Sequence, residues 1–278
     1  MKPSLPVALC CLLLSSFATS ARVAPPAVGF VDLTVQVDAF ERVVDTRPLA
    51  ACRKATLPGA RCLPVEDLLA PNRRLANFSG LLWLLGTAGL TGDERLLVIG
   101  DDAERRDFVA GLLFLAGQRQ IAVLNVRVSG RSAFAAGGGQ PRSSVREQVY
   151  RAPVRDRHLL LRSELRQLLA GDTPPVLLDG RTEEEYWGVR IRAARGGHLP
   201  GARHLASASL KRMRPELLAL PEAPLVAYGG DAFEGLAYLA RLIALGVDAS
   251  LYLEGWSGWA SDGSLPVDSL SFSRHERS

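Results

Sequence analysis

The chain has 278 residues, of which 47% are hydrophobic, with a formal net charge of +4 and an isoelectric point near 9.1. This length allows one or two domains, each with its own core. The positive charge is spread along the chain, with no basic helix interleaved with aromatic residues, so the composition argues against nucleic acid as a partner.

The N-terminus has the pattern of an export signal. Lys2 is followed by the apolar run Leu5–Phe17 and then by the small residues Ala18–Ser20, as in a secretory signal peptide with its cleavage site. The run is short for a membrane span, and a retained anchor is the alternative. We therefore predict a signal peptide at residues 1–20, a periplasmic or secreted mature protein, and no stable membrane span after cleavage.

Four cysteines are present, and two of them leave with the predicted signal. The mature chain keeps Cys52 and Cys62, which are 10 residues apart on either side of Pro58-Gly59. Export places them where a disulfide is allowed, and two unpaired, partly buried thiols are the alternative. Two cysteines without nearby histidines make a poor metal site, so we predict neither a metal nor another cofactor.

After the signal, the chain alternates between strand and helix patterns. The elements predicted for the first half are a strand at 43–47, helices at 65–69 and 78–85, a strand at 96–99, a helix ending near 117 and a strand at 121–126. In the last of these helices, Val109, Leu112, Leu113 and Ala116 recur at helical spacing. Short apolar runs such as 96–99 are typical of strands covered on both faces.

Residues 131–157 separate the two halves. They contain three consecutive glycines, two prolines, serines and several arginines without an apolar period, which is typical of a linker. The elements predicted for the second half are a helix at 159–169, a strand at 176–181, a strand at 225–228, a helix ending near 246 and a strand at 250–253.

The two halves carry two copies of one strand–loop–helix unit. Gly100 follows the strand at 96–99, Gly229 follows the strand at 225–228, and a further glycine lies 17 residues later in each copy, at Gly117 and Gly246. Matched spacing indicates an internal repeat. Strands alternating with helices favour parallel sheets. We therefore expect an α/β protein of two similar domains, each a mostly parallel sheet flanked by helices.

Three motifs of the second half carry a resemblance to a known family. They are Leu177-Leu178-Asp179-Gly180-Arg181, Gly197-His198-Leu199-Pro200-Gly201-Ala202 and Glu254-Gly255-Trp256-Ser257-Gly258-Trp259. Together they resemble the tandem rhodanese, or thiosulfate sulfurtransferase-like, family. The resemblance implies two rhodanese-like domains in tandem, at residues 27–130 and 158–270, joined by the linker. The first is degenerate, because Ala55-Thr56 replaces the Gly-His pair and Val128–Arg131 replaces the tryptophan motif.

The resemblance also implies where an active site would lie. In active members, a cysteine opens the loop between the fourth strand and the next helix and carries sulfane sulfur as a persulfide. Gly229 and Gly100 occupy that position here, so neither loop supplies a nucleophile, and we expect no catalytic residue. The two vestigial loops comprise Gly229, Gly230, Asp231, Ala232, Phe233 and Glu234, and Gly100, Asp101, Asp102, Ala103 and Glu104.

Both loops contain Asp-x-x-Glu at the start of a helix, at 231–234 and 101–104. The pattern predicts a capping box, in which Asp accepts from amides of the first turn and Glu reaches back to the loop. The amides that would hold an anionic substrate are then satisfied by the protein itself, and the carboxylates repel anions. The alternative is that the carboxylates bind a cation or a basic partner, although further ligand oxygens for a metal are absent nearby in the sequence.

Other polar residues have a structural interpretation beside a functional one. Asp179 and Arg181, like Asp45 and Arg47, are expected to form a structural ion pair rather than to hold a substrate anion. His198 is expected to hydrogen-bond the backbone of a turn rather than to act as a general base.

The remaining candidates lie around the second loop. Trp256 and Trp259 are expected to cover the edge of the core rather than to form a ligand cage. The run at 183–187 is expected to be a solvated helix start. A candidate anion rim consists of the arginines Arg181, Arg190, Arg192 and Arg195.

Three functions remain open from the sequence. The first, which we favour, is a non-catalytic binding or interaction module whose partner is a protein or a small anionic ligand. The second is a sulfurtransferase that uses Cys52 or Cys62 outside the usual loop, although neither follows a helix start that would activate the thiol. The third is a structural accessory subunit of a periplasmic complex.

Overall fold

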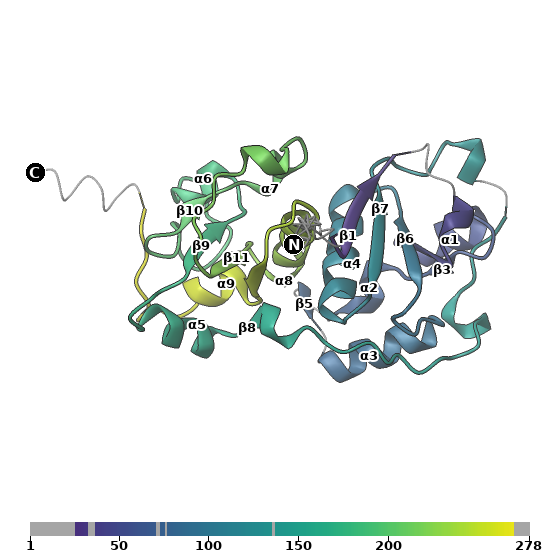
Figure 1. Cartoon of the computed structure of the whole chain (residues 1–278), viewed down its shortest axis with the longest axis horizontal. Helices are drawn as coiled ribbons and strands as arrows, with labels where there is room; N and C mark the ends of the chain where they lie inside the picture. Colours follow the sequence, from purple (N-terminus) through teal and green to yellow (C-terminus); the bar gives the residue numbers. More distant parts are fainter. Residues whose placement is uncertain (1–25, 33–36, 71–72, 76, 135–136, 270–278) are drawn as a thin grey trace, which may run out of the picture.

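The computed structural model describes residues 26–32, 37–70, 73–75, 77–134 and 137–269. The predicted signal peptide lies outside them. Within these ranges, no helix is both long and apolar enough to cross a bilayer. The chain forms two α/β domains that lie side by side along the long axis of the molecule (Figure 1).

The N-terminal domain is built on a parallel five-stranded sheet in the order β1-β7-β6-β2-β3. Its strands are β1 (Val28–Val31), β2 (Arg42–Asp45), β3 (Arg61–Cys62), β6 (Arg95–Ile99) and β7 (Gln120–Leu124). Its helices are α1 (Leu49–Lys54), α2 (Val65–Leu68), α3 (Phe78–Thr87) and α4 (Ala103–Leu115). A short antiparallel pair, β4 (Leu69–Ala70) and β5 (Arg74–Leu75), lies outside the sheet.

The C-terminal domain repeats this plan, with a parallel sheet in the order β10-β9-β11-β12-β8. Its strands are β8 (Leu159–Leu160), β9 (Val176–Asp179), β10 (Arg203–His204), β11 (Leu225–Tyr228) and β12 (Ala249–Tyr252). Its helices are α5 (Arg162–Leu169), α6 (Glu183–Tyr186), α7 (Ser207–Leu210), α8 (Ala232–Ala244) and α9 (Gly255–Ala260). We number the five strands of each sheet by their order along the chain and read each sheet from the edge that holds its first strand. Both sheets then have the order first, fifth, fourth, second, third when the C-terminal sheet is read from β8. This confirms the two mostly parallel α/β units expected from the repeat.

Burial explains why the central strands form. The four apolar residues of β6, 96–99, are completely buried, as expected for a parallel strand covered by helices on both faces. One segment forms a different element from the one predicted, beyond small shifts of boundaries elsewhere. Residues 159–160 pair with β12 as the edge strand β8, and α5 begins only at Arg162. The sheet edge offers these two apolar residues backbone partners that the sequence alone did not reveal.

The two domains meet through α4 and α8, the helices that follow the two glycine loops. Phe108 stacks on Phe233 with ring centroids 4.8 Å apart. A Cβ on Gly111 would lie 2.1 Å from the carbonyl oxygen of Leu236, so the helices approach too closely for any side chain there. Apolar residues of both helices therefore belong to one continuous core.

A buried ion pair crosses the same interface. Arg241 donates from Nε and Nη2 to the two carboxylate oxygens of Asp107, at 2.8 and 2.9 Å. Its guanidinium carbon also lies 3.5 Å from the centre of the Phe30 ring. Since both charges are buried, removal of either partner would leave the other uncompensated.

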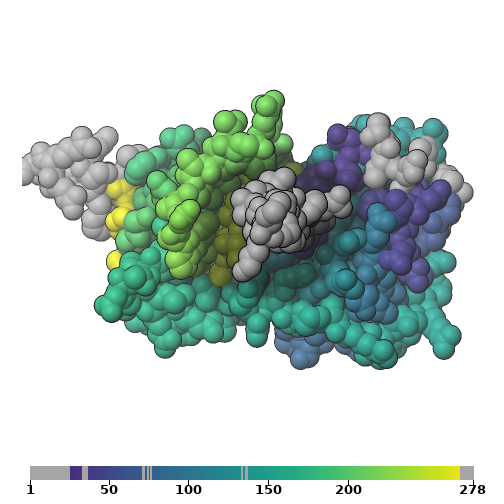
Figure 2. Space-filling view, in the orientation of Figure 1, coloured from purple at the N-terminus to yellow at the C-terminus, as the bar shows by residue number. Residues whose placement is uncertain are grey.

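The segment predicted as a linker runs along the lower edge of the molecule, from the N-terminal domain to β8 (Figures 1 and 2). Its backbone is hydrogen-bonded to the N-terminal domain, with Gln148 donating to Gly86 and Arg151 donating to Thr91. Arg142 pairs with Asp67 at 2.9 Å. The segment lacks an apolar period because backbone hydrogen bonds and ion pairs, rather than a buried face, fix its course.

Candidate functional site

The two loops lie at the carboxyl ends of corresponding strands. Gly229 directly follows β11 and leads into α8, and Gly100 directly follows β6 and leads into α4. Each of these strands is the fourth in its domain and lies in the middle of its sheet. Loops at the carboxyl edge of a parallel sheet are the usual position of a ligand site in such folds.

In the second loop, the acidic residues cap α8 as predicted. Asp231 is the N-cap and accepts from the amide of Glu234 at 3.0 Å. The carboxylate of Glu234 reaches back and accepts from the amide of Gly230, also at 3.0 Å. A Cβ on Gly230 would lie 2.5 Å from Oε2 of Glu234, so a glycine leaves room for this carboxylate.

Two arginines lie against the carboxylate of Glu234. Arg192 donates from Nη1 and Nη2 to the two oxygens of Glu234, at 2.8 and 3.1 Å, and its Nε donates to Glu185. Hydrogen bonds to Glu234 and Glu185 raise the pKa of Arg192 above its ordinary value. The cationic partner of the acidic loop, which the sequence left open, is therefore the protein itself.

The second arginine, Arg73, belongs to the N-terminal domain and was not among the residues selected from the sequence. Its Nε lies 3.3 Å from Oδ2 of Asp231 and its Nη1 lies 3.9 Å from Oε1 of Glu234. Its guanidinium carbon also lies 4.2 Å from the centre of the Phe233 ring. Arg73 has a φ of +56°, in the left-handed region that normally favours glycine. Nothing in the local sequence distinguishes this arginine from the chain's many others.

The backbone of the second loop faces the C-terminal helix α9. The carbonyl oxygens of Gly229 and Gly230 accept from the amides of Trp256 and Ser257, each at 2.8 Å. A Cβ on Gly229 would lie 2.6 Å from the backbone nitrogen of Gly235 and 2.8 Å from the carbonyl carbon of Glu234. The loop is thus folded against the first turn of α8, with no space for a side chain at Gly229.

The first loop departs from the predicted capping box by one residue. Asp102, rather than Asp101, is the N-cap of α4 and accepts from the amide of Arg105 at 2.8 Å. Asp101 turns away and accepts from the amides of Val128 and Ser129, at 3.1 and 2.8 Å. The adjacent aspartates could not be told apart in sequence, because the choice depends on a segment 27 residues away.

Glu104 therefore does not reach back to its own loop but faces the C-terminal domain. Burial raises the pKa of its carboxyl, and the nearby negative charge of Glu234 raises it further. Burial likewise raises the pKa of the Asp231 carboxyl, although the amide of Glu234 and the charge of Arg73 oppose the rise. The two loops thus place acidic groups of both domains close together at the interface.

The first loop also has no space for a side chain on its glycine. A Cβ on Gly100 would lie 2.3 Å from Oγ1 of Thr46, a buried hydroxyl that donates to the carbonyl of Ile99. The carbonyl of Gly100 accepts from the buried Arg106 at 2.6 Å.

The four rim arginines have separate roles. Arg181 is buried against Asp179 at 2.6 Å, so its charge is already paired within the protein. Arg190 and Arg192 line a cleft beside Gly230. Arg195 is not part of this rim: it donates to carbonyls at the end of α9, including those of Ala260 and Asp262. Free carbonyls at a helix C-terminus attract such a guanidinium, which the sequence spacing did not indicate.

The residues given a structural interpretation have partners of that kind. Asp45 accepts from Arg47 and from Thr56 at the end of β2. His198 is buried and stacks on Tyr186, and burial lowers its pKa. The indole nitrogens of Trp256 and Trp259 donate to the carbonyls of Arg195 and Pro266. The run 183–187 is not simply solvated, since Glu185 is buried and closes a capping box with Thr182.

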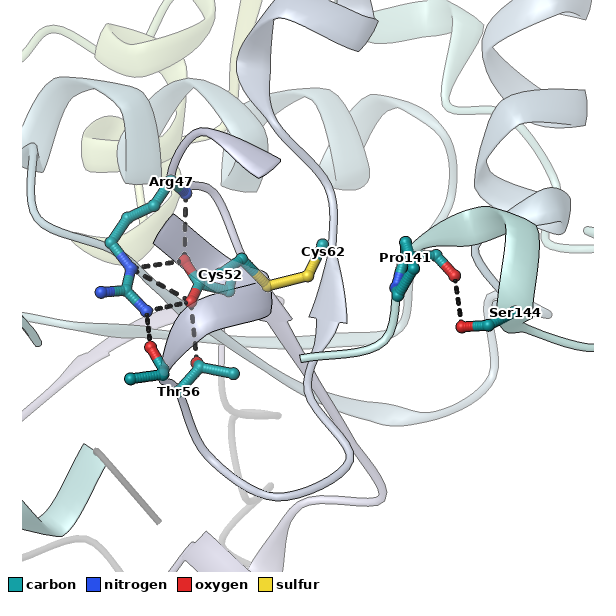
Figure 3. The surroundings of a disulfide bond; sticks show 8 residues. Arg47, Cys52, Thr56, Cys62, Pro141 and Ser144 are labelled. Atoms are coloured by element: carbon teal, nitrogen blue, oxygen red, sulfur yellow. Dashed lines mark hydrogen bonds and ion pairs between the residues drawn. A yellow bond between two sulfur atoms is a disulfide. The ribbon is translucent and has the colours of Figure 1, made fainter. Parts of the chain in front are cut away.

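The sulfur atoms of Cys52 and Cys62 are bonded to each other, which links α1 to β3 with a Cα–Cα distance of 5.8 Å (Figure 3). Both residues are completely buried. A Cβ on Gly139 would lie 2.4 and 2.7 Å from the two sulfurs, so the linker backbone covers the disulfide directly. Neither sulfur is therefore available as an exposed thiol in this state.

Two clefts, of about 260 and about 240 Å³, flank the second loop. The first is also lined by Glu104, Ser207 and Lys211, and the second by Arg73, Arg190 and Trp256. Across the part of the chain that the structure describes, no three histidine, cysteine or acidic side chains lie together in a way that could hold a metal ion. The clefts instead present guanidinium, ammonium and carboxylate groups side by side, a surface suited to polar or charged ligands.

The comparisons with known proteins agree with this geometry. A crystal structure of a probable thiosulfate sulfurtransferase is 27% identical, with a TM-score of 0.61 over 81% of this chain and 96% of that one. A structure of an EanB variant in complex with ergothioneine is 16% identical, with a TM-score of 0.64 over 90% of this chain and 66% of that one. A structure of YnjE is 19% identical, with a TM-score of 0.65 over 88% of this chain and 63% of that one. Both share the fold. Curated protein sequences gave no significant match. Residues 161–262 match the model of the rhodanese-like domain. That part of the chain, which contains the second loop, is therefore a rhodanese-like domain.

Proposed function

We propose that this chain is an exported tandem rhodanese-like protein that has lost sulfurtransferase activity and acts as a binding or interaction module. Gly229 and Gly100 stand where active members of the family carry their sulfur-accepting cysteine. Export is supported by the pattern of residues 1–20 and by the disulfide between Cys52 and Cys62.

One observation carries the proposal of inactivity. At Gly229, a Cβ would collide with backbone atoms of α8 at 2.6 and 2.8 Å. The position therefore lacks a thiol and also lacks the space that a thiol would need. Persulfide chemistry further requires free N–H donors around the sulfur, yet the carboxylate of Glu234 already occupies the amide of Gly230.

The disulfide argues against Cys52 and Cys62 as alternative nucleophiles. Cys52 and Cys62 are buried and bonded to each other beneath Gly139. A sulfurtransferase nucleophile must be a thiolate that a donor can approach, and a buried disulfide sulfur meets neither condition.

The test is thiocyanate formation from thiosulfate and cyanide by the purified mature protein. We expect no turnover above a blank without protein. Turnover that disappears in Cys52→Ser or Cys62→Ser would overturn the proposal and identify a displaced nucleophile.

The Gly229→Cys variant tests the steric argument. We expect it to remain inactive, because its thiol can be placed only by shifting the first turn of α8. Circular dichroism of the same sample shows whether the variant is folded. A folded Gly229→Cys protein with substantial turnover would show that replacing one residue restores the site, and that the loop is not closed to a side chain.

A further inference from the structure

The two clefts beside the second loop share a wall of charged side chains. Among the described residues, both are lined by Arg181, Glu185, Arg192 and Glu234. Arg181 is fixed by its buried pair with Asp179. Arg192 and Glu234 are bonded across the space between the clefts, and the Arg192 side chain is 42% exposed. This pair is therefore the part of the shared wall that can move.

The carboxylate of Glu234 is held as a bound ligand would be. Two parallel N–H groups of Arg192 donate to its two oxygens at 2.8 and 3.1 Å, the geometry that makes Arg selective for carboxylates. The amide of Gly230 adds a third donor at 3.0 Å. A complete carboxylate-binding position thus exists in the cleft, and a side chain of the protein occupies it.

Glu234 has a second cation within reach. Nη1 of Arg73 lies 3.9 Å from Oε1 of Glu234, on the side of the N-terminal domain. Contacts with Asp231 and with the ring of Phe233 hold Arg73 there. If Glu234 leaves Arg192, it moves toward an existing positive charge instead of becoming an unpaired carboxylate. Such a side chain with two discrete partners can act as a two-state element.

We propose that Glu234 is a displaceable plug: a small organic carboxylate takes its place on Arg192 and the amide of Gly230, Glu234 pairs with Arg73, and the two clefts join into one groove. This inference rests on the proposed binding function and names its ligand class and its gate. No covalent step is involved.

Charge balance in the clefts permits this exchange. Of the described residues that line the two clefts, acidic and basic side chains are equal in number. A monovalent carboxylate therefore enters a site without net repulsion, whereas a divalent tetrahedral anion gains less from the planar fork of Arg192. Binding to the native protein is weak, because the ligand competes with a carboxylate already tethered beside the site.

The test is a titration of ¹⁵N-labelled mature protein with sodium acetate, followed by NMR at the amide of Gly230, with sodium chloride at matched ionic strength as the blank. We expect Glu234→Gln to bind acetate at least 10-fold more tightly than the native protein. Arg192→Ala in the Glu234→Gln background is expected to abolish binding. Glu66→Gln, which removes an ion pair with Arg105 in the N-terminal domain, is the matched control and should leave acetate binding unchanged.

Arg73 distinguishes a gate from a simple cavity. Arg73→Ala should weaken acetate binding several-fold in the native background, where displaced Glu234 needs its second partner. The same change should have little effect in the Glu234→Gln background, where no plug has to move. A parallel titration with thiosulfate should give weaker binding than acetate in Glu234→Gln.

Two results would overturn the inference: equal acetate affinity for Glu234→Gln and native protein when both give well-dispersed spectra, or the same effect of Arg73→Ala in both backgrounds. If Glu234→Gln disturbs the fold, Glu234→Asp, which keeps the charge but shortens the plug, serves in its place. If acetate does not displace Glu234, the expected absence of thiocyanate formation still stands. Turnover in that assay would refute the inactivity proposal whatever the acetate result.

Discussion

Neighbouring glycines in the second loop are required for different reasons. The space at Gly229 is filled by backbone of α8, whereas the space at Gly230 is filled by the end of the Glu234 side chain. A flexible carboxylate can turn aside, but a helix backbone cannot without moving the residues that follow it.

This contrast predicts the effect of alanine at each position. Gly229→Ala should lower the free energy of unfolding by about 1–3 kcal/mol, as overpacking of a close contact does. Gly230→Ala should lower the free energy of unfolding by about 1 kcal/mol or less, which is the contribution of the hydrogen bond that it disturbs. Urea unfolding followed by circular dichroism measures both. Equal losses, or a larger loss for Gly230→Ala, would contradict the steric account of Gly229.

Glu104 is a residue whose negative charge is unfavourable in the folded protein. Its pKa is raised by burial and by Glu234, so the folded state favours its protonated form. The charged form therefore destabilises the fold increasingly as the pH rises from the ordinary pKa of 4.5 through the raised value.

We accordingly expect Glu104→Gln to raise the free energy of unfolding at pH 7 to 8 by roughly 0.5 kcal/mol. The gain should disappear below pH 4, where the carboxyl of Glu104 is protonated in both the folded and the unfolded protein. Thermal unfolding as a function of pH measures this. Glu66→Gln is the opposite control, because Arg105 and the backbone amide of Glu66 outweigh its burial and lower its pKa. A gain that persists at low pH would show that charge is not the cause.

Sequence patterns identified the roles of residues whose partners are close in the chain. The pairs of Asp45 with Arg47 and of Asp179 with Arg181, and the cap at Asp231, are all of this kind. Arg73, Arg195 and the first-loop cap depend on partners from distant segments. Local spacing has no information on such contacts, so these roles emerge only from the fold.

At the scale of elements, the sequence predicted the central strands and the two long helices α4 and α8. Continuous apolar runs identify buried strands, and the repeated glycine spacing aligns the two copies. The edge strand β8 and the pair β4 and β5 are only two residues long, too short for a periodic pattern to indicate.

The disulfide connects two of the smaller elements, α1 and β3, under the linker. In the chain-entropy account, a bridge that closes a loop of about 10 residues contributes about 2–3 kcal/mol. Reduction also turns a bonded sulfur pair into two thiols that need more room, and Gly139 leaves none above them.

We expect the free energy of unfolding of the Cys52→Ser/Cys62→Ser double variant to be about 2–3 kcal/mol lower than that of the native protein. Hydrogen exchange should increase first at the amides of Gly139 and Gln140, which bond Cys52 and Ala60. Dithiothreitol should destabilise the native protein and leave the double variant unaffected. An unchanged midpoint on full reduction would show that the bridge adds no stability.

For the whole molecule, the continuous core between α4 and α8 implies that the domains unfold together. Phe108, Phe233 and the buried pair of Asp107 with Arg241 contribute to both domains at once. Loss of either domain would expose these groups on the other, which favours a single transition.

Gly111→Ala tests this coupling. Its Cβ would meet the backbone of Leu236 at 2.1 Å, so we expect a loss of about 1–3 kcal/mol in the free energy of unfolding. Native-state hydrogen exchange should show equal loss of protection in β6 and β11, although the substitution lies in the N-terminal domain. Protection lost in β6 alone would mean that the domains unfold independently.

Helix α8 gives a reason why the N-terminal domain is retained. Consecutive residues of its first turn have separate tasks, since Phe233 packs against Phe108 while Glu234 faces the clefts. If the N-terminal domain were deleted, the apolar residues of α8 that pack against α4 would be exposed to water. A stable shortened protein would need polar residues at these positions at the same time. Selection can therefore maintain the N-terminal domain even apart from its own loop, because the C-terminal domain depends on it to cover this apolar stripe.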